Sequence, residues 1–213
     1  MNTAHAELRK LLTLPSLRLT ALLTWTANLV LTYAYRAAES GGEPLGDNVA
    51  LVPLGYTQAG FLVLGVLAVA SEYQEGGQIR TTLLAMPRRL PLQAAKAVAL
   101  AALTLPVAAA TATTSTVSAG EATSTPAATG YLTLTTLLGA AVASVVRRAV
   151  PAVILLLALY FIAGPLLRAW SATSAAYLPD TAALEPSRGA AATIIWTLSV
   201  LTLAAFTFHR RDA

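Results

Sequence analysis

The sequence predicts an all-α membrane protein with six transmembrane helices, an additional helix at the N-terminus and another in a cytoplasmic loop. Two observations on composition lead to this prediction: 56% of the 213 residues are hydrophobic and only 11% are charged. In an average soluble domain about a quarter of the residues are charged, and so few charges could not cover the surface of a soluble protein of this size. The third observation is that the charged residues are spaced so that they leave six long apolar intervals.

The apolar intervals have the length of membrane spans. The hydrocarbon core of a bilayer is about 30 Å thick and an α-helix rises about 1.5 Å per residue, so a span needs about 20 apolar residues. The shortest interval is the first, between Arg18 and Arg36, and its helix can begin earlier because the Arg18 side chain can extend to the interface. We therefore predict one transmembrane domain over residues 1–213, with spans at about 17–35, 50–71, 92–114, 127–146, 149–167 and 189–208.

The positions of lysine and arginine predict how these spans are oriented. With six spans both termini lie on one side, and that side carries eleven of the fourteen basic residues; the other has Arg36, Arg168 and Arg188. Because basic residues collect in cytoplasmic loops, we expect a multi-pass protein of the cell membrane with both termini in the cytoplasm. The same distribution accounts for the net charge of +4 without a nucleic-acid partner.

The first residues of the chain predict a short amphipathic helix over residues 4–14, which Pro15 ends. The expected apolar stripe consists of Leu8, Leu11 and Leu12, with Glu7, Arg9 and Lys10 away from it. Such a helix would lie along the inner surface of the membrane. The alternative is a polar tail that is frayed, because the stripe is short.

The residues that catalysis or metal binding would require are missing from the predicted spans. The chain has no cysteine, and its two histidines, His5 and His209, lie near its two ends. No span has Asp or Glu in its interior, and no G-x-S-x-G nucleophile motif occurs. Neither Lys10 nor Lys96 stands in the G-K-[ST] context of a phosphate-binding loop. We therefore expect no enzymatic activity, no metal site and no cofactor bound by this chain.

Neutral polar side chains do occur within the spans, and Asn28 and Gln58 are the most informative of them. A carboxamide in hydrocarbon requires a hydrogen-bonding partner. Each of these side chains could bond across a helix interface or could line a substrate path. For Asn28 we favour the packing role, because interhelical hydrogen bonds are the commoner use of such residues.

The loop between the second and third spans predicts an amphipathic helix over residues 72–89. Ile79, Leu83 and Met86 fall on one helical face, and acidic residues come first in it while basic residues follow Pro87. We expect Glu72 to face water or a polar interface. A helix that only rests on the membrane surface is the alternative, which amphipathicity alone does not exclude.

The same loop carries a resemblance to a known family. Glu72 and Gly77 are followed by the run Arg80 to Arg89 (RTTLLAMPRR) and then by Ala95-Lys96. This pattern resembles the loop between spans two and three of the bacterial ABC type-2 permease family, in which a Glu, a Gly, a Thr-Leu pair, a Pro-Arg and a following Lys recur. The N-terminal helix, the six spans and an outer Tyr-Leu-Pro segment before the last span also resemble that family.

The resemblance implies the transmembrane permease subunit of an ATP-driven exporter. Two six-span subunits, either two copies of this chain or this chain and a related one, would enclose a path, and two separate ATPase subunits would bind ATP and Mg²⁺. The 72–89 segment would be the coupling helix that docks on the ATPase. The residues that we expect to make this contact are Glu72, Tyr73, Glu75, Arg80, Thr81, Leu83 and Arg88.

The neutral, threonine-rich and aliphatic spans suit an amphipathic or apolar cargo such as a drug, a peptide or a lipid-like molecule. A different class of function is also open: a non-transporting membrane assembly or immunity factor that binds partners through the 72–89 loop. A membrane ATPase subunit that co-purifies with the chain would separate the two.

Overall fold

The structure, a computed structural model, describes residues 3–41, 51–73, 89–118, 124–171, 173, 177–179 and 186–211. These residues form helices and no strand, so the all-α prediction is confirmed for them. The elements are α1 (Thr3–Thr13), α2 (Pro15–Ser40), α3 (Leu51–Ala70), α5 (Arg89–Ser118), α6 (Thr125–Val146), α7 (Ala149–Ala158), the π-helical segment η2 (Leu159–Ala163), α8 (Gly164–Trp170) and α10 (Pro186–Arg211).

Four of these helices are long and apolar enough to cross a membrane, as expected of a multi-pass membrane protein. They are Val52–Ala70, Leu92–Ser118, Thr125–Val146 and the continuous unit of α7, η2 and α8, Ala149–Trp170. The predicted first and last spans lie in α2 and α10, which do not belong to this group. The apolar part of α10, Ala191–Thr207, is shorter than the other four.

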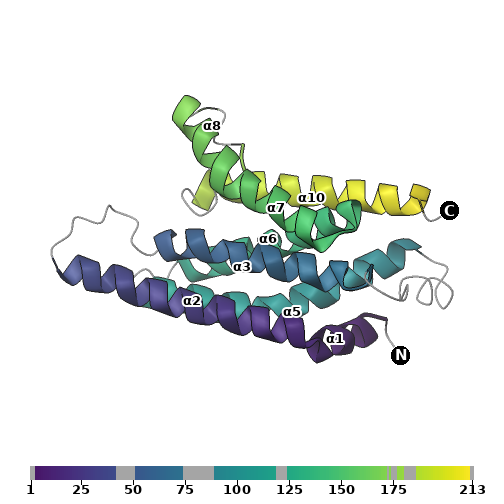
Figure 1. Cartoon of the computed structure of the whole chain (residues 1–213), viewed down its shortest axis with the longest axis horizontal. Helices are drawn as coiled ribbons and strands as arrows, with labels where there is room; N and C mark the ends of the chain where they lie inside the picture. The colour runs from purple at the N-terminus through teal and green to yellow at the C-terminus, as the bar shows by residue number, and fades with distance from the viewer. Residues whose placement is uncertain are drawn as a thin grey trace.

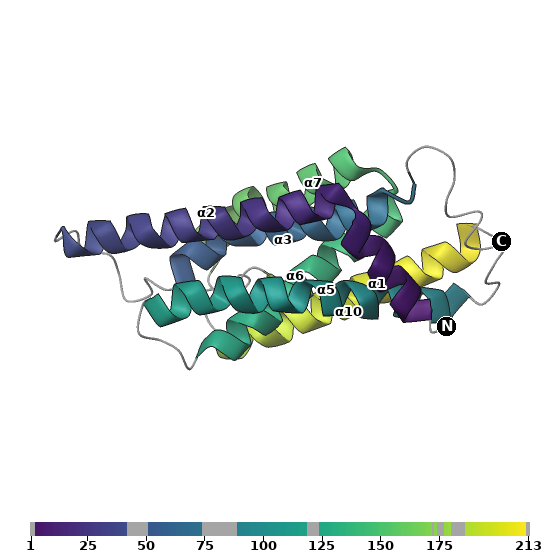
Figure 2. The same cartoon turned by 90° about the horizontal axis from the view of Figure 1, so that it is seen from below.

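Successive long helices run in opposite directions along one elongated bundle (Figures 1 and 2). As a result α1 lies at the same end of the bundle as the C-terminal end of α10. The turn that follows α3, the beginning of α5 and the turn between α6 and α7 also lie there. We call this end of the bundle the termini end.

The centre of the bundle is the close contact between α3 and α6. Buried residues occur all around α3, including Phe61, Leu62 and Leu64, as expected of a helix that other helices surround. Two glycines allow the close approach. A Cβ atom at Gly65 would lie 2.0 Å from the carbonyl oxygen of Thr136, and one at Gly139 would lie 2.6 Å from that of Leu62. Small residues at such crossings let helix backbones meet in membrane proteins.

The helix after α6 is longer than the predicted span at 149–167, because it continues to Trp170 through η2. Its buried positions Ala152, Leu156, Tyr160 and Gly164 are four residues apart. In a regular α-helix, with 3.6 residues per turn, such positions drift around the axis by about 40° at each step. The wider π-helical turn offsets part of this drift, so one face of the helix stays against the bundle.

The N-terminal helix forms where it was predicted and stops before Pro15, since Leu14 is extended (φ −71°, ψ 116°). Its buried face differs from the prediction, however. Glu7 and Leu11 are buried, whereas Leu12 is 47% exposed. The reason is that α1 packs against α5, and residues four apart share that face. The position of α1 relative to a membrane stays a prediction.

Candidate functional site

The chain leaves α3 in a turn, Ser71–Tyr73, so the predicted helix 72–89 does not begin at Glu72. The backbone N–H of Glu72 donates to the carbonyl of Val69, and that of Tyr73 donates to the carbonyl of Ala70, both at 3.1 Å. Both hydrogen bonds join a residue to the one three positions before it, which tightens the end of the helix. At the other end of the predicted helix, Arg89 is already the first residue of α5. The remaining predicted contact residues, Glu75, Arg80, Thr81, Leu83 and Arg88, lie outside the described residues.

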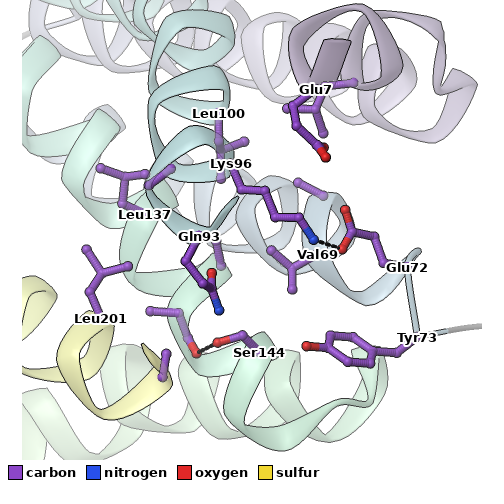
Figure 3. Close-up of a pocket in the computed structure, with 16 residues that line it drawn as sticks. Glu7, Val69, Glu72, Tyr73, Gln93, Lys96, Leu100, Leu137, Ser144 and Leu201 are labelled. Atoms are coloured by element: carbon purple, nitrogen blue, oxygen red, sulfur yellow. Dashed lines mark hydrogen bonds and ion pairs between the residues drawn. The ribbon is translucent and has the colours of Figure 1, made fainter. Parts of the chain in front are cut away.

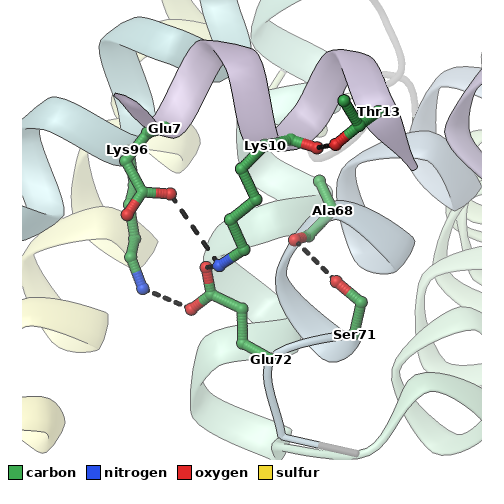
Figure 4. Close-up of polar contacts among 7 residues, drawn as sticks. All are labelled: Glu7, Lys10, Thr13, Ala68, Ser71, Glu72 and Lys96. Atoms are coloured by element: carbon green, nitrogen blue, oxygen red, sulfur yellow. Dashed lines mark hydrogen bonds and ion pairs between the residues drawn. The ribbon is translucent and has the colours of Figure 1, made fainter. Parts of the chain in front are cut away.

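The carboxylate of Glu72 is buried between two lysines, which corrects the expectation that it faces water. The residue is only 4% exposed. Lys96 on α5 donates to its Oε2 atom (Figure 3), and Lys10 on α1 donates to its Oε1 atom at 2.7 Å (Figure 4). The turn places this side chain where α1 and α5 meet α3. Ion pairing on both oxygens offsets the cost of removing the carboxylate from water.

Glu7 completes a group of four charged side chains that we call the Glu72 cluster: Glu7, Lys10, Glu72 and Lys96. The carboxylate of Glu7 lies 4.0 Å from the Lys10 ammonium (Figure 4). Two carboxylates and two ammonium groups give the cluster a formal charge of zero. These two lysines are the only ones in the sequence, and both bind one carboxylate.

The turn after α3 is also tied to the turn between α6 and α7. The guanidinium of Arg147 lies 5.5 Å from the centre of the Tyr73 ring, within the range of a cation–π interaction. Arg147 caps α6 in a left-handed conformation, with φ 59°, and its N–H donates to the carbonyl of Ala143. Ser71–Tyr73 is therefore anchored to α1, α5 and the end of α6.

A cavity of about 50 Å³ lies beside the Glu72 cluster (Figure 3). Helices α1, α3, α5, α6 and α10 all contribute to its wall. Its wall combines polar side chains, including Glu7, Gln93 and Lys96, with apolar ones, including Leu137 and Leu201. The termini end of the bundle thus contains an amphipathic pocket that α1 covers.

Asn28 is fully buried and joins three helices. Its Nδ2 atom donates to the Thr111 carbonyl at 3.2 Å and to Thr114 Oγ1 at 2.8 Å on α5. Its Oδ1 atom accepts from Thr57 on α3 at 3.1 Å and from Ser115 on α5 at 3.0 Å. These are the contacts that the packing interpretation expects, because they use both N–H donors and both acceptor positions of the carboxamide.

Gln58 makes a comparable contact farther along α3. It is 5% exposed, and its Oε1 atom accepts a hydrogen bond from the hydroxyl of Tyr131 on α6. Both candidate path residues thus hold helices together within this chain. Among the described residues no group of three or more His, Cys, Asp or Glu side chains is placed to hold a metal ion.

The sequence interpretation selected Glu72 but missed its two lysine partners and Glu7, which contacts one of them. The available signal was position: Lys10, Glu72 and Lys96 all lie at the same predicted membrane boundary. Charges at that depth are costly unless they pair. Which of them pair depends on which helices are neighbours, and the order of helices along the chain does not determine that.

Comparisons with protein-family models, with curated proteins and with solved structures found no match for this chain. The features of the described residues that bear on function lie together at the termini end, where the Glu72 cluster borders the pocket.

Proposed function

We propose that this chain is the transmembrane permease subunit of an ATP-driven exporter. In this proposal it crosses the cell membrane six times with both termini in the cytoplasm, and it has no ATP site of its own. It moves an amphipathic or apolar cargo, such as a drug, a peptide or a lipid-like molecule, out of the cell.

The lengths of α2 and α10 support six crossings. Arg18 and Arg36 are eighteen residues apart on α2, which corresponds to about 27 Å along a helix and is close to the thickness of the hydrocarbon core. Both side chains are exposed, so each can extend its guanidinium to one interface. The apolar part of α10 is 17 residues long, or about 25 Å, and arginines follow it at 210 and 211.

The observation that carries the proposal is the ion pair between Glu72 and Lys96. These are the Glu and the following Lys of the run that resembles the ABC type-2 permease loop, and they lie at its two ends. Their contact joins the turn after α3 to α5, so the described residues that flank the 74–88 segment form a rigid base. A segment that moves the spans when a partner pushes it needs such a rigid base, because a loose loop would absorb the displacement.

The proposal includes a definite assembly. Two copies of this chain, or this chain and a related permease, pair in the bilayer, and two ATPase subunits bind beneath them and carry ATP and Mg²⁺. In this assembly the 74–88 segment docks on the ATPase through Leu83 and its neighbouring charges. Asn28 and Gln58 bond between helices inside one subunit, so a cargo path is better sought between subunits.

Co-purification in detergent tests the proposal. The chain should bring down an ATPase subunit in equal numbers, and Leu83→Asp should reduce both this association and cargo export. Leu84→Asp is the matched control, because the sequence predicts Leu84 to lie off the apolar stripe of Ile79, Leu83 and Met86. If no ATPase associates with the unaltered chain, the assembly-factor alternative is favoured. If Leu83→Asp leaves association intact, the docking role of this segment is wrong.

A further inference from the structure

The pocket at the termini end combines polar and apolar side chains in one wall, as a site for an amphiphile requires. It extends from the Glu72 cluster to the apolar side chains Leu100, Leu137 and Leu201 (Figure 3). The residues around it are well buried, with Leu100 at 2% and Leu11 at 6% exposure. Their packing nevertheless leaves this space unfilled. Its volume of about 50 Å³ would hold roughly three or four water molecules. A small polar group of about three or four non-hydrogen atoms occupies a similar space.

Two polar side chains in this wall have unused hydrogen-bonding capacity. Glu7 is 9% exposed; its carboxylate makes no hydrogen bond to the described residues, and its nearest cation is Lys10 at 4.0 Å. Gln93 makes no hydrogen bond to the described part of the chain either, although its amide lines the same pocket. Neither the Glu7 carboxylate nor the Gln93 amide is among the fully buried, unpartnered side-chain atoms of the described residues, so both can still reach a hydrogen-bonding partner. The pocket therefore offers an acceptor at Glu7 and donors at Gln93 and Lys96.

The charge of the Glu72 cluster selects the kind of head that the pocket would accept. Its two carboxylates and two ammonium groups already balance, so an added anion or cation would leave an uncompensated charge in a partly buried site. A neutral head with hydroxyl or amide groups can donate to Glu7 and accept from Gln93 or Lys96 without disturbing the ion pairs of Glu72.

We propose that the pocket beneath α1 binds a neutral amphiphile, whose hydroxyl- or amide-bearing head contacts Glu7 and Gln93 and whose apolar chain lies along Leu100, Leu137 and Leu201. Helix α1 covers the site and contributes Glu7 and Leu11 to its wall. Binding does not depend on transport, so this inference stands apart from the proposed function. The amphiphile has two possible sources, the surrounding bilayer and the cargo.

Photolabelling of the purified chain in lipid nanodiscs tests the proposal. Three probes share one diazirine-bearing alkyl chain and differ in the head, which is glycerol, carboxylate or trimethylammonium. We expect the glycerol probe to label residues 93–100 about threefold to tenfold more than the other two, the difference that one net hydrogen bond produces. An excess of unlabelled monoacylglycerol should compete with the glycerol probe and remove this labelling. This competition uses the unaltered protein and requires no variant.

Matched variants locate the site. Ala97→Leu fills the pocket and should abolish the preference for glycerol, whereas Ala94→Leu adds the same side chain on the exposed face of α5 and should not. Glu7→Gln leaves the cluster with one excess positive charge and should shift labelling toward the carboxylate probe. Equal labelling by all three heads, or labelling that Ala97→Leu does not reduce, would overturn the proposal and leave a pocket that holds water only. ATP-dependent export of the glycerol probe from cells identifies it as cargo, and its retention identifies a bound lipid.

Discussion

Replacing Glu72 with glutamine should destabilise the protein substantially. The substitution keeps the shape of the side chain but removes the charge that Lys10 and Lys96 share, and the site is 4% exposed. Removing one partner of a buried ion pair typically costs about 3–5 kcal/mol. Lys10 is 28% exposed and keeps Glu7 at 4.0 Å, so it can recover part of its interactions. We therefore expect a loss of about 3 kcal/mol, near the lower end of that range.

The assay is equilibrium unfolding of the purified protein in mixed micelles, with Glu39→Gln as the control. Glu39 is an exposed residue of α2, and its substitution should change the free energy of unfolding by less than about 0.5 kcal/mol.

A double-mutant cycle isolates the pair. Lys96→Met alone should cost less than Glu72→Gln, because Glu72 keeps Lys10, and the coupling energy between the two sites should be about 1–3 kcal/mol. A loss below about 0.5 kcal/mol for Glu72→Gln, or a coupling energy near zero, would show that the carboxylate faces water and that the cluster does not form.

Three further predictions concern packing and topology. Gly65→Ala should lower the free energy of unfolding by about 1–3 kcal/mol, because its Cβ would meet the backbone of α6 at 2.0 Å. Gly55→Ala, which has open space around it, should be neutral in the same assay. Equal effects of the two substitutions would contradict the close contact between α3 and α6. Asn28→Leu should cost about 1–2 kcal/mol, since the hydroxyls that bind it keep other partners, and an unchanged unfolding midpoint would argue against the hydrogen-bonded site. A cysteine at Gly42 should react with an impermeant thiol reagent in intact cells and one at Gly77 should not; labelling at Gly77 would refute the proposed orientation.

The sequence by itself determined the helical class and where most helices lie. The span predicted at 127–146 is the helix Thr125–Val146, and that predicted at 50–71 is Leu51–Ala70. The boundary at Pro15 also agrees with the structure. These features were predictable because they depend on local properties: the length of an apolar run sets the length of a span, and a proline lacks the N–H that would continue a helix.

The tertiary structure alone decided the surroundings of the candidate site. Lys10 and Lys96 are 62 and 24 residues from Glu72 along the chain, and only the packing of α1 and α5 against α3 brings them to it. For the same reason Glu7 turned out to be buried although its neighbours in sequence predicted an exposed position. Hydrophobic periodicity shows that a helix has a face to bury, but the identity of the partner helix depends on how side-chain volumes and glycine contacts fit together across the bundle.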